Sequence, residues 1–415
     1  MTDPENAGDG TVIDAAKEYG YTRTPARQEQ FTRAAESLRS KDGWSASPSS
    51  PKELVADLAL EGGGVKGIAI VGAVSALAEA GYRFPRVAGT SAGAIAATLI
   101  AAISKAGKPM SSLKGYLDGL SFMNFMPEGK IHHFMDHHFG KAGGGISDAD
   151  ILLHRMGLYP GDYLAQWLEP ILHGDLGVQT FADLKITPAD DPGMSLPENR
   201  RYRLVVHTSD ITRGELVRLP WDYNYYGHDR DTEEVVTAVR ASMSIPFFFE
   251  PVTFDAQAAD VDVPQPGGGV LSTHYEGGTV TWVDGGMLRN FPINAFARID
   301  DKPPRWPTIG IKLSSLQKQF GATEAASTTY KLARGCLSTM MNEWDAYSVD
   351  ESSAARTIFV DNAGLTATDF DLTTAQQNAL FLNGVEAATA FVIEMSGRGG
   401  IPRTANAAQA LAGTQ

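Results

Sequence analysis

The sequence predicts an α/β protein in which short strands alternate with helices around a mostly parallel sheet. From residue 54 onward, short apolar segments alternate with longer segments rich in Ala, Val and Ile. This pattern is typical of strand–loop–helix units in layered α/β domains. Glycine-rich segments at residues 62–67 and 89–93 also stand where the first two predicted strands lead into helices.

The elements follow in order along the chain. Strands are predicted at residues 55–60, 86–88, 202–208, 216–219, 279–283 and 307–312. Helices are predicted at residues 67–80, 92–104, 322–347 and 374–393, with one more at about 25–40. Residues 255–278 are rich in Asp, Pro and Gly, and we expect a long surface loop there.

The composition suits a large core and an acidic surface. The chain has 415 residues, 43% of them apolar, which is enough for a large core or two modest domains. A net charge of −14 disfavours nucleic acid as a partner, and it disfavours strong docking onto anionic lipid. Any membrane contact must therefore rely on apolar insertion or on a local basic patch. A single cysteine, Cys336, excludes an intrachain disulfide.

No targeting or membrane-spanning segment is evident. Residues 1–10 are polar and acidic and show no Sec-type signal pattern. The longest apolar run, residues 88–103, is interrupted by Gly, Ser and Thr and is predicted to be a buried core helix. We therefore expect a cytoplasmic or peripheral membrane protein, with secretion by a route other than Sec left open.

A candidate nucleophile lies in the segment Gly-Thr-Ser-Ala-Gly at residues 89–93. A strand before it and a helix after it are the context of a nucleophile elbow, which presents Ser91 on a sharp turn. Gly89 and Gly93 would allow strand and helix to approach closely. Since serine is also a good N-cap, a simple helix cap is the alternative for this motif taken alone.

Residues 62–67, Gly-Gly-Gly-Val-Lys-Gly, predict an anion-binding loop at a helix N-terminus. The same spacing satisfies the dinucleotide-binding pattern, which expects an acidic residue at the end of the second strand. That strand ends in Gly-Thr-Ser, so the dinucleotide interpretation is disfavoured. Successive glycine amides hold an oxyanion as readily as a phosphate. The candidate oxyanion donors are the amides of Gly62, Gly63 and Gly64.

The base that would serve Ser91 is predicted to be an aspartate. A Ser–His–Asp hydrolase normally carries its histidine late in the chain, but no histidine follows His274. Asp284 instead stands at the end of an apolar strand, before Gly285 and Gly286. An aspartate is a weak base at its ordinary pKa of about 3.9, so burial must raise that pKa for a serine–aspartate dyad to work.

Two further patterns remain open. His133 and His137 would share one helical face within residues 132–138, but no third ligand or zinc pattern supports a metal, and none is expected. The apolar stretch 122–126 and the triplet 247–249 could line an acyl-chain channel or pack in the core.

Taken together, the motifs resemble the patatin-like phospholipase family, which is related in fold to the catalytic domain of cytosolic phospholipase A2. Residues 60–67 resemble the family's oxyanion block, residues 89–93 its nucleophile elbow, residues 239–252 its intermediate block, and residues 284–292 its aspartate block. The resemblance implies a three-layer α/β/α sandwich with a central mostly parallel sheet and a dyad of Ser91 and Asp284, without cofactor or metal. The residues that support these motifs are Lys66, Gly67, Gly89, Gly93, Gly285 and Gly286.

The expected organisation follows from this resemblance. Residues 54–300 would form the catalytic domain, and residues 301–396 would complete it. Residues 1–53 are expected to be a loosely attached polar extension, and residues 397–415 a disordered tail.

The expected activity is hydrolysis of a phospholipid or another lipid ester, and the need for a protein activator is left open. A neutral-lipid or general carboxylesterase, a triad esterase, a nucleotide-binding protein and a non-catalytic lipid-binding relative are the alternatives. Head-group preference, sn-position and oligomeric state are not predicted.

Overall fold

The structure is a computed structural model, and it describes residues 18–40, 54–125, 156–191, 196–264, 269–297, 306–313, 351–365 and 371–401, with isolated positions between 304 and 369. Most of the predicted helix at 322–347, the histidine segment 132–138 and the predicted tail beyond residue 401 lie outside the described residues.

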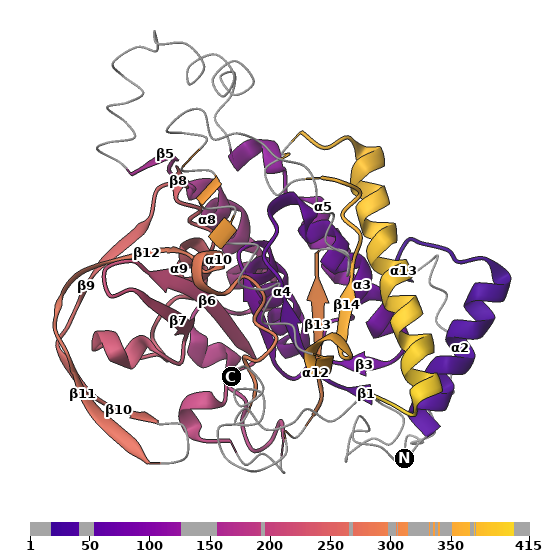
Figure 1. Cartoon of the computed structure of the whole chain (residues 1–415), viewed down its shortest axis with the longest axis horizontal. Helices are drawn as coiled ribbons and strands as arrows, with labels where there is room; N and C mark the ends of the chain where they lie inside the picture. Colours follow the sequence, from indigo (N-terminus) through magenta and orange to yellow (C-terminus); the bar gives the residue numbers. More distant parts are fainter. Residues whose placement is uncertain are drawn as a thin grey trace, which may run out of the picture.

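An eight-stranded sheet lies at the centre of the molecule (Figure 1). Its strands are β2 (Asp57–Leu60), β4 (Val87–Thr90), β6 (Leu204–Asp210), β7 (Glu215–Leu219), β9 (Val252–Ala256), β12 (Gly278–Asp284), β13 (Thr308–Lys312) and β14 (Thr357–Phe359). The order is β14-β13-β2-β4-β6-β12-β9, and β7 also pairs with β6. The pairs from β14 to β6 are parallel, whereas β7, β9 and β12 pair antiparallel.

Helices surround this sheet, which confirms the predicted three-layer α/β/α arrangement with a mostly parallel sheet. The main ones are α2 (Pro25–Ser40), α3 (Ile68–Glu79), α4 (Ala92–Lys105), α5 (Ser112–Asp118), α8 (Asp162–Glu169), α9 (Val235–Ser242), α10 (Gly286–Arg289) and α13 (Thr374–Arg398). Strands β2, β4 and β13 are buried along their whole length, which explains why the sequence shows them as continuous apolar runs.

The expectation of a long loop at residues 255–278 is wrong. The segment contains β10 (Ala259–Pro264) and β11 (Val270–Tyr275), which pair antiparallel as a two-stranded hairpin. Val261 is buried and its neighbours Asp260 and Asp262 are exposed. This is the period-two alternation of a half-buried strand, which the Asp, Pro and Gly content of the segment masks.

The N-terminal extension was expected to be loosely attached, but its described part, residues 18–40, packs against the core. Helix α2 is present where it was predicted, and it packs beside α13 (Figure 1). It buries four apolar side chains at helical spacing, namely Phe31, Ala34, Ala35 and Leu38. Ahead of it, Arg23 donates hydrogen bonds to Glu79 of α3 and to Thr389 of α13. This segment therefore completes the core around α3 and α13.

Helix α13 packs against α3 at very short range. A Cβ added at Gly72 of α3 would overlap the carbonyl oxygen of Phe381, and one added at Gly384 of α13 would overlap that of Ala69. By length and composition α13 could span a membrane, but half of its apolar window is buried within the protein. Packing in the core accounts for its apolar composition.

The structure shows in part whether the apolar segments 122–126 and 247–249 pack in the core or line a channel. Phe125 is buried and lies edge-on to Tyr163 and to Phe249, which is buried as well. These two rings belong to the core, whereas Phe247 is half exposed. Met126 and the apolar residues that follow it up to Phe139 lie outside the described residues.

Candidate active site

Ser91 lies on a sharp turn between β4 and α4. Its φ of 54° and ψ of −126° are unusual for a residue other than glycine. A Cβ at Gly89 would overlap the carbonyl oxygen of Gly93, and one at Gly93 would overlap that of Leu60. Neither position has room for a side chain, because backbone segments lie in close contact there. The turn has the geometry of a nucleophile elbow.

Asp284 is brought to Ser91 by the register of strand β6. Since β7 occupies one edge of β6, strands β4 and β12 share the other edge. Strand β4 ends at Thr90, which pairs with His207, and β12 ends at Asp284, which pairs with Thr208. The carboxyl ends of β4 and β12 thus meet at consecutive positions of β6, and this places Asp284 beside the elbow.

The Asp284 carboxyl group is fully buried. Its Oδ1 accepts a hydrogen bond from the Gly286 amide at 2.7 Å, while its Oδ2 has no hydrogen bond of ordinary geometry among the described residues. A Cβ at Gly285 would overlap the carbonyl oxygen of His207, so this glycine is needed for β12 to lie against β6.

Burial raises the pKa of Asp284 from 3.8 to about 7, although the Gly286 amide and the nearby Ser91 hydroxyl both act to lower it. Desolvation outweighs these two contributions because the charged form loses its water. A carboxylate with this pKa can accept a proton near neutral pH.

The glycine-rich loop follows β2 and lies against the elbow. A Cβ at Gly62 would stand 3.0 Å from the Ser91 Cβ. The Gly62 amide donates to the carbonyl oxygen of Asn290 at 3.0 Å, and Asn290 Nδ2 donates back to the Gly62 carbonyl oxygen at 3.1 Å. The amides of Gly63 and Gly64 donate to no acceptor among the described residues, and Gly64 has a φ of 55°.

The two supporting residues at the end of the loop lie in η1 (Gly64–Gly67). A Cβ at Gly67 would stand 3.1 Å from the Cβ of Ala92, the residue after Ser91. Burial lowers the pKa of Lys66. Just before the loop, the buried Glu61 carboxylate pairs with the Lys312 ammonium group and accepts the Leu313 amide. These contacts fix the loop to the end of β13.

A cavity of about 320 Å³ opens beside the loop and the elbow. Gly64, Gly67 and Ala92 line it, together with the apolar side chains Ile68, Val71, Ile95, Ala96, Leu117, Leu120 and Phe381. Five polar residues complete the lining, namely Lys114, Asp118, Thr374, Gln377 and Asn378. Helices α3, α4, α5 and α13 contribute most of these residues. A single flexible hydrocarbon chain matches the apolar part of this lining.

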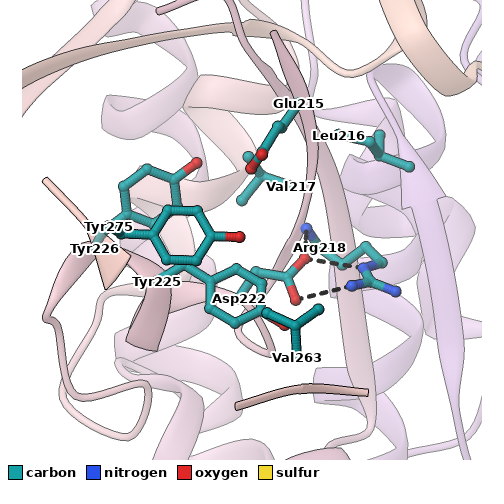
Figure 2. A pocket seen from close by; sticks show the side chains of 9 residues that line it. All are labelled: Glu215, Leu216, Val217, Arg218, Asp222, Tyr225, Tyr226, Val263 and Tyr275. Atoms are coloured by element: carbon teal, nitrogen blue, oxygen red, sulfur yellow. Dashed lines mark hydrogen bonds and ion pairs between the residues drawn. The ribbon is translucent and has the colours of Figure 1, made fainter. Parts of the chain in front are cut away.

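A second cavity, of about 280 Å³, is shown in Figure 2. Within it Arg218 donates two hydrogen bonds to Asp222, and Tyr225 stacks on Tyr275 with ring centroids 5.2 Å apart. No residue of the elbow, the glycine-rich loop or Asp284 lines it. We therefore assign the candidate active site to the first cavity.

Among the described histidines, His207 lies closest in the sheet to the elbow but faces away from Asp284. It pairs with Thr90 and Arg218, and directly paired residues share a face of the sheet. Asp284 pairs with the next residue, Thr208, whose side chain points to the opposite face. Burial lowers the pKa of His207 to about 3. Within the described part of the chain, no group of His, Cys, Asp and Glu residues has the arrangement of a metal site.

Three residues that hold the site together stand within the family-like blocks of the sequence, but the sequence analysis assigned them no role. The Ser242 hydroxyl accepts the Ser91 amide at 2.9 Å, and the Ser244 carbonyl oxygen accepts the Asp284 amide at 2.8 Å. Asn290, as described, holds the glycine-rich loop. Ser242 and Ser244 belong to the block at 239–252, and the polar residues of this block were the sequence feature that could have indicated these contacts.

The fold and this site define a class of protein, a layered α/β protein with a strained serine beside a buried aspartate. The family profile described as patatin-like phospholipase matches residues 58–297. The uncharacterized protein YqhO of Bacillus subtilis (strain 168) is 32% identical over 328 residues, which cover 78% of this chain and 93% of YqhO. The chain belongs to the patatin-like phospholipase family, as its motifs predicted, and this family acts on lipids.

Two solved structures are also similar. The crystal structure of VipD from Legionella pneumophila aligns over 81% of this chain and 66% of its own, with 17% identity and a TM-score of 0.41. The heterodimeric ExoU–SpcU complex from the type III secretion system of Pseudomonas aeruginosa aligns over 82% of this chain and 51% of the matched chain, with 18% identity and a TM-score of 0.35. These similarities are too low to bear on substrate or partners.

Proposed function

We propose that the chain is a serine lipid acyl hydrolase of phospholipase A type, with Ser91 as nucleophile and Asp284 as base. The single observation that carries this proposal is the fully buried Asp284 carboxyl group, with a pKa of about 7, beside the hydroxyl of a strained elbow serine. A buried carboxylate beside the Ser91 hydroxyl, with one oxygen that no other described group binds, is suited to accept the serine proton.

The chemistry proceeds in two halves. Ser91 Oγ attacks the ester carbonyl carbon as its proton passes to Asp284, and the tetrahedral oxyanion forms. The intermediate collapses, the C–O bond to the alcohol breaks, and Asp284 returns the proton to the leaving oxygen. Water then attacks the acyl-enzyme with Asp284 again as base, which releases the fatty acid and restores Ser91.

The oxyanion donors in this proposal are chiefly the amides of Gly63 and Gly64. Both lie at the start of a helical turn and are free of other described acceptors, whereas the Gly62 amide is bound to Asn290. Gly62 instead allows the loop to approach Ser91, since a side chain there would collide with Asn290 Oδ1. Loss of one oxyanion donor typically costs about 3 kcal/mol of barrier.

The apolar side chains of the 320 Å³ cavity support a fatty acyl ester as substrate. Gly64 of the glycine-rich loop and Ala92 of the elbow line the cavity, and apolar side chains of α3, α4, α5 and α13 line it next to the polar residues of α5 and α13. An acyl chain in this cavity would leave the ester carbonyl at the elbow. A general carboxylesterase acting on short acyl groups remains the second candidate, since the same dyad would serve it.

The experiment that tests the proposal is fatty-acid release from vesicles of phospholipid and of neutral lipid. Wild type is compared with Ser91→Ala and Asp284→Asn, and each protein is also treated with a fluorophosphonate that labels activated serines. We expect both variants to lose release by about 10³-fold or more, and only Ser91→Ala to lose the label completely. Release by Ser91→Ala at the wild-type rate would exclude the dyad.

A further inference from the structure

We infer that Ser242 is a positioning residue of the site, which holds the Ser91 backbone in the strained geometry that presents its hydroxyl to Asp284. The inference rests on the proposed function, because it assigns a role next to the proposed nucleophile. Ser242 is the last residue of α9 and is completely buried.

The Ser242 hydroxyl connects the elbow to the central sheet. It accepts a hydrogen bond from the Ser91 amide at 2.9 Å and donates one to the His207 carbonyl oxygen at 2.6 Å. His207 is the β6 residue that pairs with Thr90, the last residue of β4. One hydroxyl group therefore ties the elbow to the strand on which β4 and β12 meet.

The Ser91 amide has no other partner among the described residues. A residue with φ of 54° persists only where surrounding contacts hold it. Buried amides are almost always hydrogen-bonded, so the Ser242 hydroxyl satisfies a group that the sharp turn removes from regular secondary structure.

The surrounding segment is itself well fixed. Arg240 donates to Ser244 Oγ at 2.6 Å and to the Glu250 carbonyl oxygen at 2.8 Å. The carbonyl oxygen of Ser244 in turn accepts the Asp284 amide. The end of α9 and the residues directly after it thus contact the backbone of both proposed dyad residues, and Ser242 makes the contact with the nucleophile.

The test is Ser242→Ala in the full chain, with Ser209→Ala as its matched control. Ser209 is also a buried serine, two residues beyond His207 on β6, but its hydroxyl makes no hydrogen bond among the described residues. The measurements are kcat and KM on a soluble short-chain ester, the rate of fluorophosphonate labelling, the pH–rate profile, and thermal unfolding.

For Ser242→Ala we expect kcat and the labelling rate to fall together by about 10- to 100-fold, since small misplacements of a reacting group cost rates of this order. KM and the midpoint of the pH–rate profile should not change, because Ser242 contacts neither the cavity nor the Asp284 carboxyl group. A substitution that disordered the whole site would change both KM and the midpoint of the pH–rate profile. Ser209→Ala should retain wild-type kcat.

A folded Ser242→Ala protein with wild-type kcat and labelling would overturn the inference, as would an equal loss in Ser209→Ala. If Ser242→Ala does not fold, Ser242→Cys decides, because a thiol is a weaker hydrogen-bonding group of similar size. Wild-type kcat in that variant would also overturn it. A wild-type protein that neither takes the label nor cleaves ester would instead show that the proposed function itself fails.

Discussion

The Ser91 hydroxyl lies beside the fully buried Asp284 carboxyl group, and burial keeps the pKa of that carboxyl at about 7. Because a general base acts only when deprotonated, we expect kcat/KM to rise with pH and to be half-maximal near pH 7. Rates on a soluble ester between about pH 5 and 9 measure this. A rate independent of pH over this range would contradict Asp284 as the base.

The same pKa predicts an effect on stability. The pKa of Asp284 is raised on folding from 3.8 to about 7, so the unfolded chain releases this proton first and the folded state loses stability as pH rises between these values. The Asp284→Asn variant lacks the buried charge. We therefore expect it to melt at a higher temperature than wild type at about pH 8 and to lose most of that advantage near pH 4. If Asp284→Asn and wild type differed in melting temperature by the same amount at both pH values, the pKa of this carboxyl group would not be raised on folding.

The contact between α3 and α13 predicts an unequal response of two glycines in one helix. A Cβ at Gly384 would overlap the Ala69 carbonyl oxygen, whereas one at Gly397 meets nothing within 4 Å. Gly384→Ala should force the helices apart and lower the free energy of unfolding by about 1–3 kcal/mol or more. Gly397→Ala should be neutral or stabilise by up to about 1 kcal/mol, since alanine favours the helix. Denaturant unfolding compares them, and equal effects would contradict this packing.

The N-terminal segment predicts a similar contrast between two arginines. Arg23 and Glu79 form an almost fully buried ion pair, while Arg33 pairs with Glu29 on the surface. Arg23→Ala leaves the Glu79 carboxylate buried without its guanidinium partner, which typically costs about 3–5 kcal/mol. Arg33→Ala should change stability by less than about 1 kcal/mol. Thermal or denaturant unfolding distinguishes the two, and an Arg23→Ala protein as stable as wild type would mean that the buried ion pair does not contribute to stability.

Much of the central sheet could be predicted from the sequence because its buried strands appear as apolar runs, but the edge strands β9 and β14 were not predicted. Strands β2, β4, β12 and β13 lie within a residue or two of their predicted positions. The β10–β11 hairpin was missed because its Asp, Pro and Gly content is typical of a loop. Helix α2 was predicted but its packing was not, although Phe31, Ala34, Ala35 and Leu38 follow the spacing of a buried helical face.

The candidate site was predicted only in part. Ser91 and Asp284 stand in recognisable local motifs, whereas their proximity depends on the register of β6, which no local pattern shows. The contacts of Ser242 and Asn290 join segments 151 residues apart in one case and 228 in the other. Such contacts follow from tertiary packing and could not be derived from spacing.

The cavity predicts that Ile95 of α4 sets the length of acyl chain that the protein accepts. Ile95 is almost fully buried and lines the cavity together with Val71 and Phe381. Ile95→Phe should fill part of the cavity and shift the preference toward shorter chains. Ile95→Ala should enlarge the cavity and favour longer ones, since each methylene in an apolar pocket is worth about 1–3 kcal/mol.

Ile100→Ala is the matched control, because Ile100 is buried in the same helix but does not line the cavity. It should destabilise the fold by about 2–5 kcal/mol and leave chain-length preference unchanged. The measurement is kcat/KM for a series of p-nitrophenyl esters of increasing acyl length, taken well below the melting temperature of each variant. Opposite shifts in the two Ile95 variants would place the acyl chain between α3, α4 and α13. An unchanged preference in both would mean that the acyl chain binds elsewhere, even if Ser91 and Asp284 carry out the chemistry.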